Sequence, residues 1–413
     1  MNLNELECNP AAKERKEHKK LHLLRREREK GRLVSPKSDE SGGEGARLCS
    51  TAVLNCTPPI DSIRASAILL RMTPSAFRNF LTRRLVASLG LLWLGCTLTS
   101  LPVCADEAKP AKPAPIPVIL DTDIGDDIDD TWALALLLKS PELDLKLVVG
   151  DYGEAQYRAR LLARLLERAG RSNVPVGVGL DIAPRGEGRQ AAWIKDYDLK
   201  SYPGKVLTNG VQAIIDTIMN SPQPVTLICI GPVPNIAEAL KREPRIAHHA
   251  RFVGMDGSVR LGYDGAKPPC AEWNVKADPK ALQAVFAAPW DITITPLDTC
   301  GLVILAGDKY RRVLDSTNRI VADLIANYRV WLVNQPALAA DMADHHSTTL
   351  FDTVAIYLAL RPDQCVMEKL NLRVTDDGFT VIDPQARPVN VAAQWKDLGA
   401  YEDFLVERLA GRP

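Results

Sequence analysis

Six aspartates occupy ten consecutive positions, 121–130, and this acidic run is the part of the sequence best suited to chemistry. Like charges packed this closely repel one another unless a cation lies among them. Ca²⁺ accepts about six to eight oxygen ligands in a flexible geometry, whereas Mg²⁺ demands a stricter octahedron. The run therefore predicts a divalent-cation site that favours Ca²⁺. The alternative is a solvated acidic loop.

The residues on either side of the run favour the cation site. The apolar segment 117–120 precedes it and is typical of a short buried strand. The segment 131–138, which reads Thr-Trp-Ala-Leu-Ala-Leu-Leu-Leu, follows it and predicts a buried helix. The acids then lie on a strand-to-helix loop, which is where α/β proteins place their active sites.

Beyond the run, apolar strand-like and helix-like segments alternate along the chain. Such alternation predicts an α/β domain over residues 116–413, built on an open, mostly parallel sheet with helices on both faces. We expect a β-rich tail after residue 360. The expected strands are 118–120, 145–149, 176–179, 225–230, 250–255 and 292–296, and the expected helices are 131–139, 155–168, 211–220, 235–242, 279–287, 315–332 and 352–360.

Four further motifs contain residues that could belong to a site. A strand ends at Ile230 before a Gly-Pro turn, and such a turn can free a backbone carbonyl for a cation. Glu272-Trp273-Asn274 could bind sugar hydroxyls against an aromatic wall, although a surface loop would read the same. Asp352 opens an apolar helix and could be a plain N-cap. The pair 345–346, His-His, is more typical of an exposed loop.

The first 105 residues differ in charge from the rest. They contain 17 Lys and Arg against 10 Asp and Glu, which leaves 34 against 41 and a formal charge of about −7 in the remainder. This balance argues against nucleic acid or anionic lipid as a partner. Four cysteines remain after residue 105, and their scattered spacing predicts four small buried side chains, with one disulfide possible in an exported protein.

The segment 72–105 reads as a secretory signal peptide. Three arginines precede a mostly apolar stretch from 85 to 101, and small residues precede a cleavage point near Ala105. We therefore expect export to the periplasm or the medium, no stable membrane span in the mature chain, and translation from Met72. Residues 1–71 are then an upstream artefact or a disordered extension, and 106–115 is a Pro-rich linker. The alternative for 85–101 is a membrane anchor.

Taken together, four motifs resemble the inosine-uridine preferring nucleoside hydrolases. They are Asp-Thr-Asp-Ile-Gly-x-Asp-x-Asp-Asp after a short strand, the Gly-Pro-x-x-Asn turn, Glu-x-Asn followed by Asp-Pro, and a late Asp that opens an apolar helix. The resemblance spans residues 116–360. It implies an open α/β fold with Ca²⁺ at the carboxyl ends of the strands, and hydrolysis of the N-glycosidic bond of ribonucleosides or a related N-riboside.

Carried over position by position, the resemblance implies a role for each residue. Asp123 is expected to bind Ca²⁺ and to accept the proton of the attacking water. Two further carboxylates and one carbonyl complete the metal shell. The expected metal ligands are Asp123, Asp130, Asp352 and the carbonyl of Ile230, and the expected substrate contacts are Asp129, Asp127, Asp151, Met255, Glu272, Trp273 and Asn274.

The chain departs from the family pattern at two places. Phe351 precedes Asp352 where many members have a His that protonates the leaving base, so that His345, His346 or stacking on Trp273 or Trp193 would have to substitute. Asp151 stands where an Asn commonly contacts the ribose. The alternative function is therefore a relative that binds a sugar without hydrolysing a nucleoside. The expected partner is a small nucleoside or sugar, and a homo-oligomer is compatible with the sequence.

Overall fold

The computed structural model describes residues 114–184 and 186–411. The predicted extension 1–71 and signal peptide 72–105 lie outside these residues, and so does the linker up to residue 113. The assignments made for these segments stay predictions.

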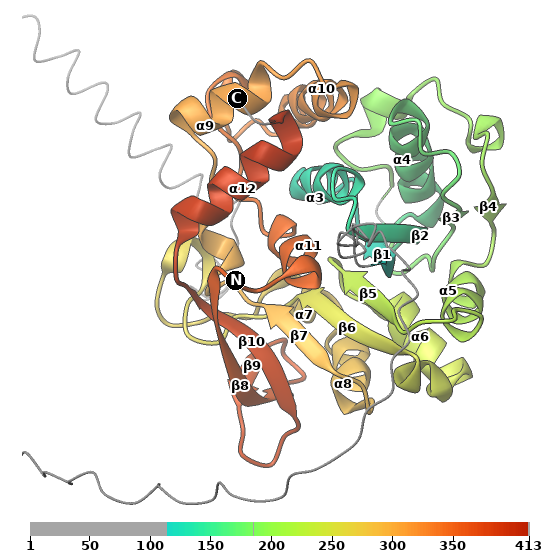
Figure 1. Ribbon diagram of the computed structural model, residues 1–413, viewed down its shortest axis with the longest axis vertical. Helices are drawn as coiled ribbons and strands as arrows, with labels where there is room; N and C mark the ends of the chain where they lie inside the picture. Colours follow the sequence, from blue (N-terminus) through green and yellow to red (C-terminus); the bar gives the residue numbers. More distant parts are fainter. Residues whose placement is uncertain (1–113, 185, 412–413) are drawn as a thin grey trace, which may run out of the picture. The chain divides into compact units, whose positions relative to one another are not determined.

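The domain is built on one ten-stranded sheet in the order β4-β3-β2-β1-β5-β6-β7-β10-β8-β9 (Figure 1). Neighbouring strands are parallel from β4 to β10, and only β8 and β9 add antiparallel pairs. The mostly parallel sheet is the one predicted. The strands are β1 (Ile116–Thr122), β2 (Leu143–Gly150), β3 (Val176–Gly177), β4 (Val206–Leu207), β5 (Val225–Cys229), β6 (Ala250–Met255), β7 (Ile292–Thr295), β8 (Cys365–Val374), β9 (Thr380–Ile382) and β10 (Pro388–Trp395).

The strand order reverses at the pair β1 and β5. From β1 the chain builds outward through β2, β3 and β4, and it then returns to place β5 on the other side of β1. In open α/β sheets the crevice beyond the carboxyl ends of the strands at such a reversal is where ligands bind. The acidic loop follows β1, and the turn at Ile230 follows β5, so both lie at this point.

Helices cover both faces of the sheet because the strands are apolar on both sides. Along β1, Val118 and Leu120 pack into one core, while Ile119 between them packs into the other. The first core holds α3 (Asp129–Leu138), α4 (Ala155–Arg168), α9 (Gly307–Leu314), α10 (Arg319–Val333), α11 (Thr353–Leu360) and α12 (Leu398–Ala410), and the second holds α5 (Gly210–Met219), α6 (Pro234–Arg242), α7 (Trp273–Ala277) and α8 (Pro279–Ala287).

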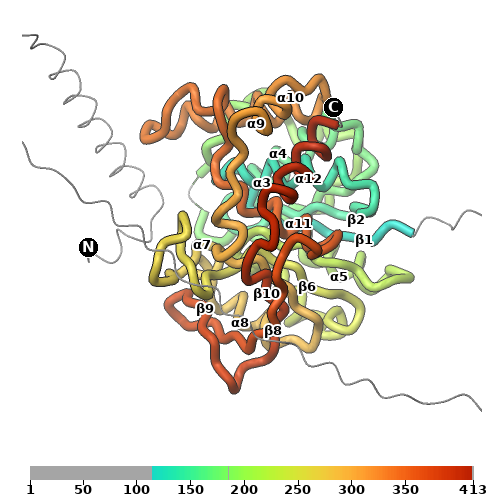
Figure 2. The backbone as a smooth tube through the Cα atoms, turned by 60° about the vertical axis from the view of Figure 1, so that its left-hand side comes forward, coloured from blue at the N-terminus to red at the C-terminus, as the bar shows by residue number. Residues whose placement is uncertain are grey.

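Helix α11 lies directly on the middle of the sheet. It contacts β5, β6 and β7 on one side and α3 on another, and both views show it between the sheet and α12 (Figures 1 and 2). All of its residues except the last are buried, which explains why its sequence is apolar all round. Its position brings its N-terminal end beside the start of α3.

The structure also shows elements that the sequence analysis did not predict. The helices α7, α9 and α12 were not expected, and the tail expected to be β-rich ends in α12. The four cysteines after residue 105 are free and buried, as predicted. Within residues 114–184 and 186–411, every helix is too short or too polar to cross a lipid bilayer.

Candidate active site

Three carboxylates meet where α3 and α11 begin. Asp129, Asp130 and Asp352 each offer one oxygen, and these oxygens lie within 4.8 Å of one another. All three side chains are buried, with exposed fractions of 2–4%. Among the described residues, Asp130 accepts a hydrogen bond from Thr122 Oγ1, and Asp129 accepts one from the backbone amide of Asp352 at 3.3 Å. We call these three residues the acidic triad.

The local sequence explains how the acidic triad forms. Asp129 and Asp130 occupy the first turn of α3, where the helix dipole favours negative charge. Asp352 stands at the N-cap position of α11, but its side chain makes no capping hydrogen bond. It belongs to the triad instead. Asp352 therefore occupies the predicted N-cap position, but its side chain does not make the hydrogen bond of a plain N-cap.

Burial and mutual repulsion raise the pKa values of the acidic triad. Loss of water raises the pKa of Asp129, Asp130 and Asp352 well above the ordinary range of a carboxyl group, and the neighbouring carboxylates raise each of them further. No described Lys, Arg or His forms an ion pair with any of the three. The charge of Arg158 lowers the pKa of Asp130 only in part. Buried oxygen donors that repel one another in this way fit a hard divalent cation.

Asp123 lies beside the acidic triad but does not belong to it. Burial raises its pKa to about 8, the cation of Arg158 lowers it, and Asp126 and Asp151 raise it. The charge of Asp123 in turn raises the pKa of Asp130 and Asp352. Its predicted roles as metal ligand and proton acceptor stay predictions, and its place next to the triad suits both.

The predicted carbonyl ligand also reaches this region. The amide of Ile230 donates to the carbonyl of Asp121 at 2.9 Å, which ties the end of β5 to the end of β1. A Cβ atom built on Gly231 would stand 3.1 Å from Asp123 Oδ1. The turn after β5 therefore lies against Asp123, and glycine allows that approach.

Asp127 lies near the acidic triad but outside it. Its Oδ1 accepts a hydrogen bond of 2.6 Å from the amide of Ile128, and it is only partly buried. Its charge nevertheless raises the pKa of Asp129 and of Asp352. Asp129 is itself one of the three triad carboxylates, and the ribose contact stays a prediction for both residues.

The second group of predicted substrate contacts lies at the end of β6. It consists of Met255, Glu272 and Asn274, and we call it the Glu272 group. Glu272 is the N-cap of α7, and its carboxylate accepts from the amides of Asn274 at 2.8 Å, Gly257 at 3.1 Å and Val275 at 3.2 Å. Asn274 Nδ2 donates to the carbonyl of Met255 at 3.0 Å. Glu272, Asn274 and Met255 are thus held rigidly by one another.

The buried thiol of Cys300 lies near both the acidic triad and the Glu272 group. Burial raises the pKa of its thiol well above the ordinary value, and the charges of Glu272, Asp352 and Asp129 raise it further. These charges act on one buried atom from both groups. The acidic triad and the Glu272 group therefore border the same region.

Aromatic side chains stand beside the Glu272 group. The amide of Trp273 donates to the hydroxyl of Tyr263 at 3.0 Å, and the ring of Tyr263 meets Phe351 edge-on with centroids 5.9 Å apart. The ring of Trp273 is 42% exposed. Phe351 precedes Asp352 in the chain, so the ring pair of Tyr263 and Phe351 links the start of α7 to the start of α11.

The carboxylate of Asp151 is already hydrogen-bonded to backbone amides at the start of α6. One of its oxygens accepts from the amide of Val233 at 2.8 Å and the other from the amide of Asn235 at 3.4 Å, which caps the start of α6. Burial raises its pKa to about 7 in spite of these bonds. A role in ribose binding stays a prediction for this residue.

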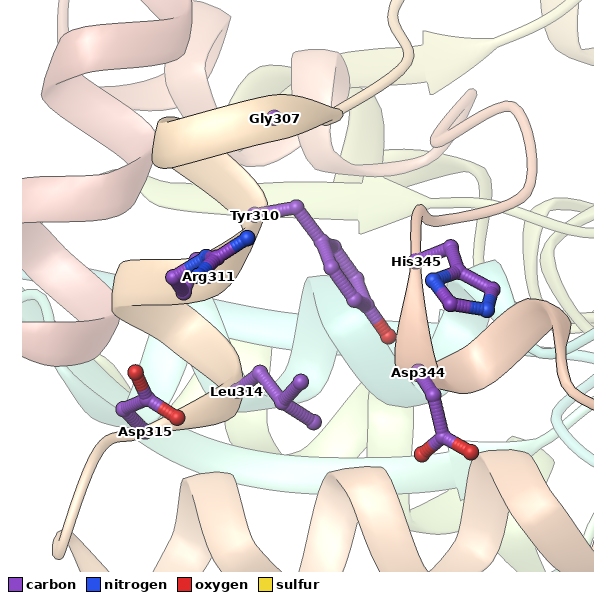
Figure 3. Close-up of a pocket in the computed structure, with 7 residues that line it drawn as sticks. All are labelled: Gly307, Tyr310, Arg311, Leu314, Asp315, Asp344 and His345. Carbon is purple, nitrogen blue, oxygen red and sulfur yellow. The ribbon is translucent and has the colours of Figure 1, made fainter.

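The histidines proposed as substitute acids lie elsewhere. His345 is 65% exposed, and its Nε2 is 3.3 Å from Asp341. It lines a surface pocket of about 220 Å³ together with residues of α9, and none of the predicted site residues lines that pocket (Figure 3). His346 Nδ1 is 2.8 Å from the carbonyl of Ser347.

Sequence reasoning missed Thr122 and Arg158. Thr122 Oγ1 donates to Asp130 and also accepts from the amide of Ile124 at 3.1 Å. Arg158, in the first turn of α4, is 2% exposed and donates to the carbonyl of Ile124 in the acidic loop at 2.8 Å. A buried Arg within the amphipathic pattern of α4 is the signal that could have revealed the second of these.

Comparison with known proteins agrees with this geometry. The family model described as inosine-uridine preferring nucleoside hydrolase matches residues 118–401. The non-specific ribonucleoside hydrolase RihC of Escherichia fergusonii is 30% identical over 319 residues, which cover 71% of this chain and 98% of that protein. The RihC protein of Salmonella paratyphi B is 28% identical over 320 residues, covering 73% and 99%.

Solved structures share the fold. The plant nucleoside hydrolase PpNRh1 superposes with a TM-score of 0.62 at 22% identity, over 72% of this chain and all of that one. A purine-preferring ribonucleoside hydrolase from Gardnerella vaginalis gives 0.59 at 24%, over 71% and 98%. The open sheet is that of the nucleoside hydrolases, which are N-glycosidases. The chain belongs to the inosine-uridine preferring nucleoside hydrolase family.

Proposed function

We propose that the protein hydrolyses the N-glycosidic bond of ribonucleosides, or of a related N-riboside, and that it depends on Ca²⁺. The acidic triad carries this proposal, because three buried carboxylate oxygens within 4.8 Å of one another call for a hard cation. We propose Asp123 and the carbonyl of Ile230 as the further ligands; the charge of Asp123 acts on the triad, and the turn that follows Ile230 lies against Asp123. The relatives at 28–30% identity are described as non-specific ribonucleoside hydrolases, which supports the choice of substrate class.

Different residues act on the attacking water and on the sugar. A Ca²⁺ ion held by the acidic triad would lower the pKa of a water molecule and so supply a nucleophile at neutral pH. Asp123, buried beside the triad, is the carboxylate placed to accept the proton of the attacking water. The surrounding carboxylates stabilise positive charge that develops on the sugar.

The sugar is held on its other side by the Glu272 group. Glu272, Asn274 and Met255 are fixed by hydrogen bonds before any substrate arrives, so little ordering is needed on binding. Trp273, which is exposed beside Tyr263 and Phe351, offers a flat apolar surface to the departing base. Stacking there takes the place of the missing His.

Release of free base tests this function. The purified protein is incubated with inosine, uridine, adenosine or nicotinamide riboside at millimolar Ca²⁺, and the free base is measured by chromatography. Release of base that stops when a chelator is added supports the proposal. Absence of release from all four compounds contradicts it.

A second candidate is a sugar-binding relative without turnover. It is favoured by Phe351 in place of His and by Asp151, whose oxygens already cap α6. Calorimetry with ribose separates the two candidates. Binding of ribose with no release of base favours this one.

We also propose that the mature protein is exported after cleavage near Ala105. The proposal rests on the order of arginines, apolar stretch and small residues in 72–105. N-terminal sequencing of the exported protein should give a start near Asp106. A mature chain that begins upstream of Met72 contradicts it.

A further inference from the structure

The acidic loop is held in place from outside by hydrogen bonds to its own backbone. Five successive carbonyls, from Asp123 to Asp127, each accept a hydrogen bond from a donor that lies elsewhere in the chain. One guanidinium, that of Arg158, serves the first two. The other three accept from Tyr157 Oη and the Arg189 amide (Gly125), from Arg189 Nη1 and Trp331 Nε1 (Asp126), and from Gln190 Nε2 (Asp127).

This arrangement fixes the shape of the loop without any cation. Each of these carbonyls is already bonded to the scaffold, so the path of the backbone is set, and with it the position of Asp123 beside the acidic triad. A metal site whose ligands are pre-aligned loses less freedom on binding than one that must be assembled. The donors to the backbone therefore help to determine how tightly the site binds.

Arg158 is the only one of these donors that is buried, charged and bonded to several parts of the loop among the residues described. Besides the two carbonyls it reaches the carbonyl of Tyr152 with Nε and the carboxylate of Asp126 with Nη2 at 2.9 Å. It is 2% exposed. One planar fork thus joins the acidic loop to the loop that follows β2.

Two glycines make room for this side chain. A Cβ atom on Gly150 would lie 2.7 Å from Arg158 Cβ, and a Cβ atom on Gly153 would lie 2.8 Å from Arg158 Nη2. Gly153 also has a φ of +72°, which suits glycine. The backbone around Arg158 is therefore shaped to accept it.

We propose that Arg158 is a positioning residue of the metal centre, which aligns the loop from Asp123 to Asp127 for a divalent cation. This inference rests on the proposed function. A simple counter-charge could equally be a lysine. Lysine carries one compact ammonium group on a flexible stem and cannot reproduce a rigid fork that serves acceptors on several sides. The alignment hypothesis therefore predicts that Arg158→Lys loses affinity although it keeps the charge.

Calorimetric titration of the metal-free full chain with Ca²⁺ tests the proposal. Arg158→Lys should bind Ca²⁺ at least tenfold more weakly than the wild type, and hydrogen exchange should rise in residues 121–130. The matched control is Arg168→Lys, the same change in the same helix, where the guanidinium instead binds Asp323 on α10. The control should bind Ca²⁺ within twofold of the wild type.

The outcomes separate the inference from the proposed function. Arg158→Lys that is folded and binds Ca²⁺ within twofold of the wild type overturns the positioning role alone. A wild-type protein that binds no Ca²⁺ contradicts the proposed function itself. If Arg158→Lys does not fold, Gly153→Ala serves as the second variant, because it displaces Nη2 without removing the charge. At least threefold weaker binding is expected from it, and unchanged binding overturns the inference.

Discussion

Replacement of Asp352 by Asn should stabilise the metal-free protein and abolish its response to Ca²⁺. In the metal-free protein this carboxylate is buried beside Asp129 and Asp130 and makes no capping bond, so its charge only adds repulsion. Asparagine has nearly the same shape and is an equally good residue at an N-cap. The same change removes one oxygen charge that a cation requires.

The size of the gain follows from the spacing. Two unit charges 4.8 Å apart repel by about 3 kcal/mol at an effective dielectric constant of ~20. The raised pKa values of the acidic triad mean that protons already relieve part of this repulsion. The residual gain is about 2 kcal/mol, which corresponds to a rise of roughly 5 °C in Tm for a domain of this size.

Thermal unfolding in chelator and in excess Ca²⁺ measures both effects. The wild type should gain stability with Ca²⁺, by about 3 kcal/mol at a hundred times Kd, whereas Asp352→Asn should not. Asp298→Asn is the control. This buried carboxylate accepts hydrogen bonds from the amides of Val259 at 2.9 Å and Arg260 at 2.8 Å, so its replacement should lower Tm. A lower Tm for Asp352→Asn in chelator, like that of the control, would refute the reasoning.

Three further outcomes are expected. Trp273→Ala should raise KM about tenfold with little change in Tm, because the ring is 42% exposed; an unchanged KM removes it from the substrate site. Gly231→Ala should lower kcat about tenfold, because its Cβ would press on Asp123 at 3.1 Å; steady-state kinetics decide, and full activity speaks against a close turn. Burial raises the folded-state pKa of Asp151 to about 7, so the folded state binds its proton more tightly than the unfolded state, and the contribution of this group to stability is lost as pH rises from about 4 to 7. Denaturant unfolding in chelator should show this fall, on the order of 4 kcal/mol, and Asp151→Asn should lack it; an equal fall in the variant assigns it to other groups.

The fold was predictable from the sequence because its strands and helices have simple burial patterns. Strands such as 225–229 are buried on both faces and appear in the sequence as short apolar runs. In amphipathic helices such as 155–168 the apolar residues recur with the helical period of about 3.6 residues. Helix α12 was missed because it follows the antiparallel strands that make the tail look β-rich. Helix α7 was missed because it has only five residues and is set by the capping of Glu272.

The site was predictable only in part, for a physical reason. The sequence shows which residues carry oxygen ligands, and the resemblance to the nucleoside hydrolases orders them along the chain. It does not show which oxygens meet, because Asp352 joins Asp129 and Asp130 through the packing of α11 on α3. Arg158 was missed because its place in the amphipathic pattern of α4 can indicate that it is buried but not which groups its guanidinium contacts.

A crystal structure of the protein grown with Ca²⁺ tests the central claim most directly. We predict one ion bonded to oxygens of the acidic triad, with Asp123 and the carbonyl of Ile230 completing its shell. An ion held by other residues, or no ion at this position in millimolar Ca²⁺, would contradict it.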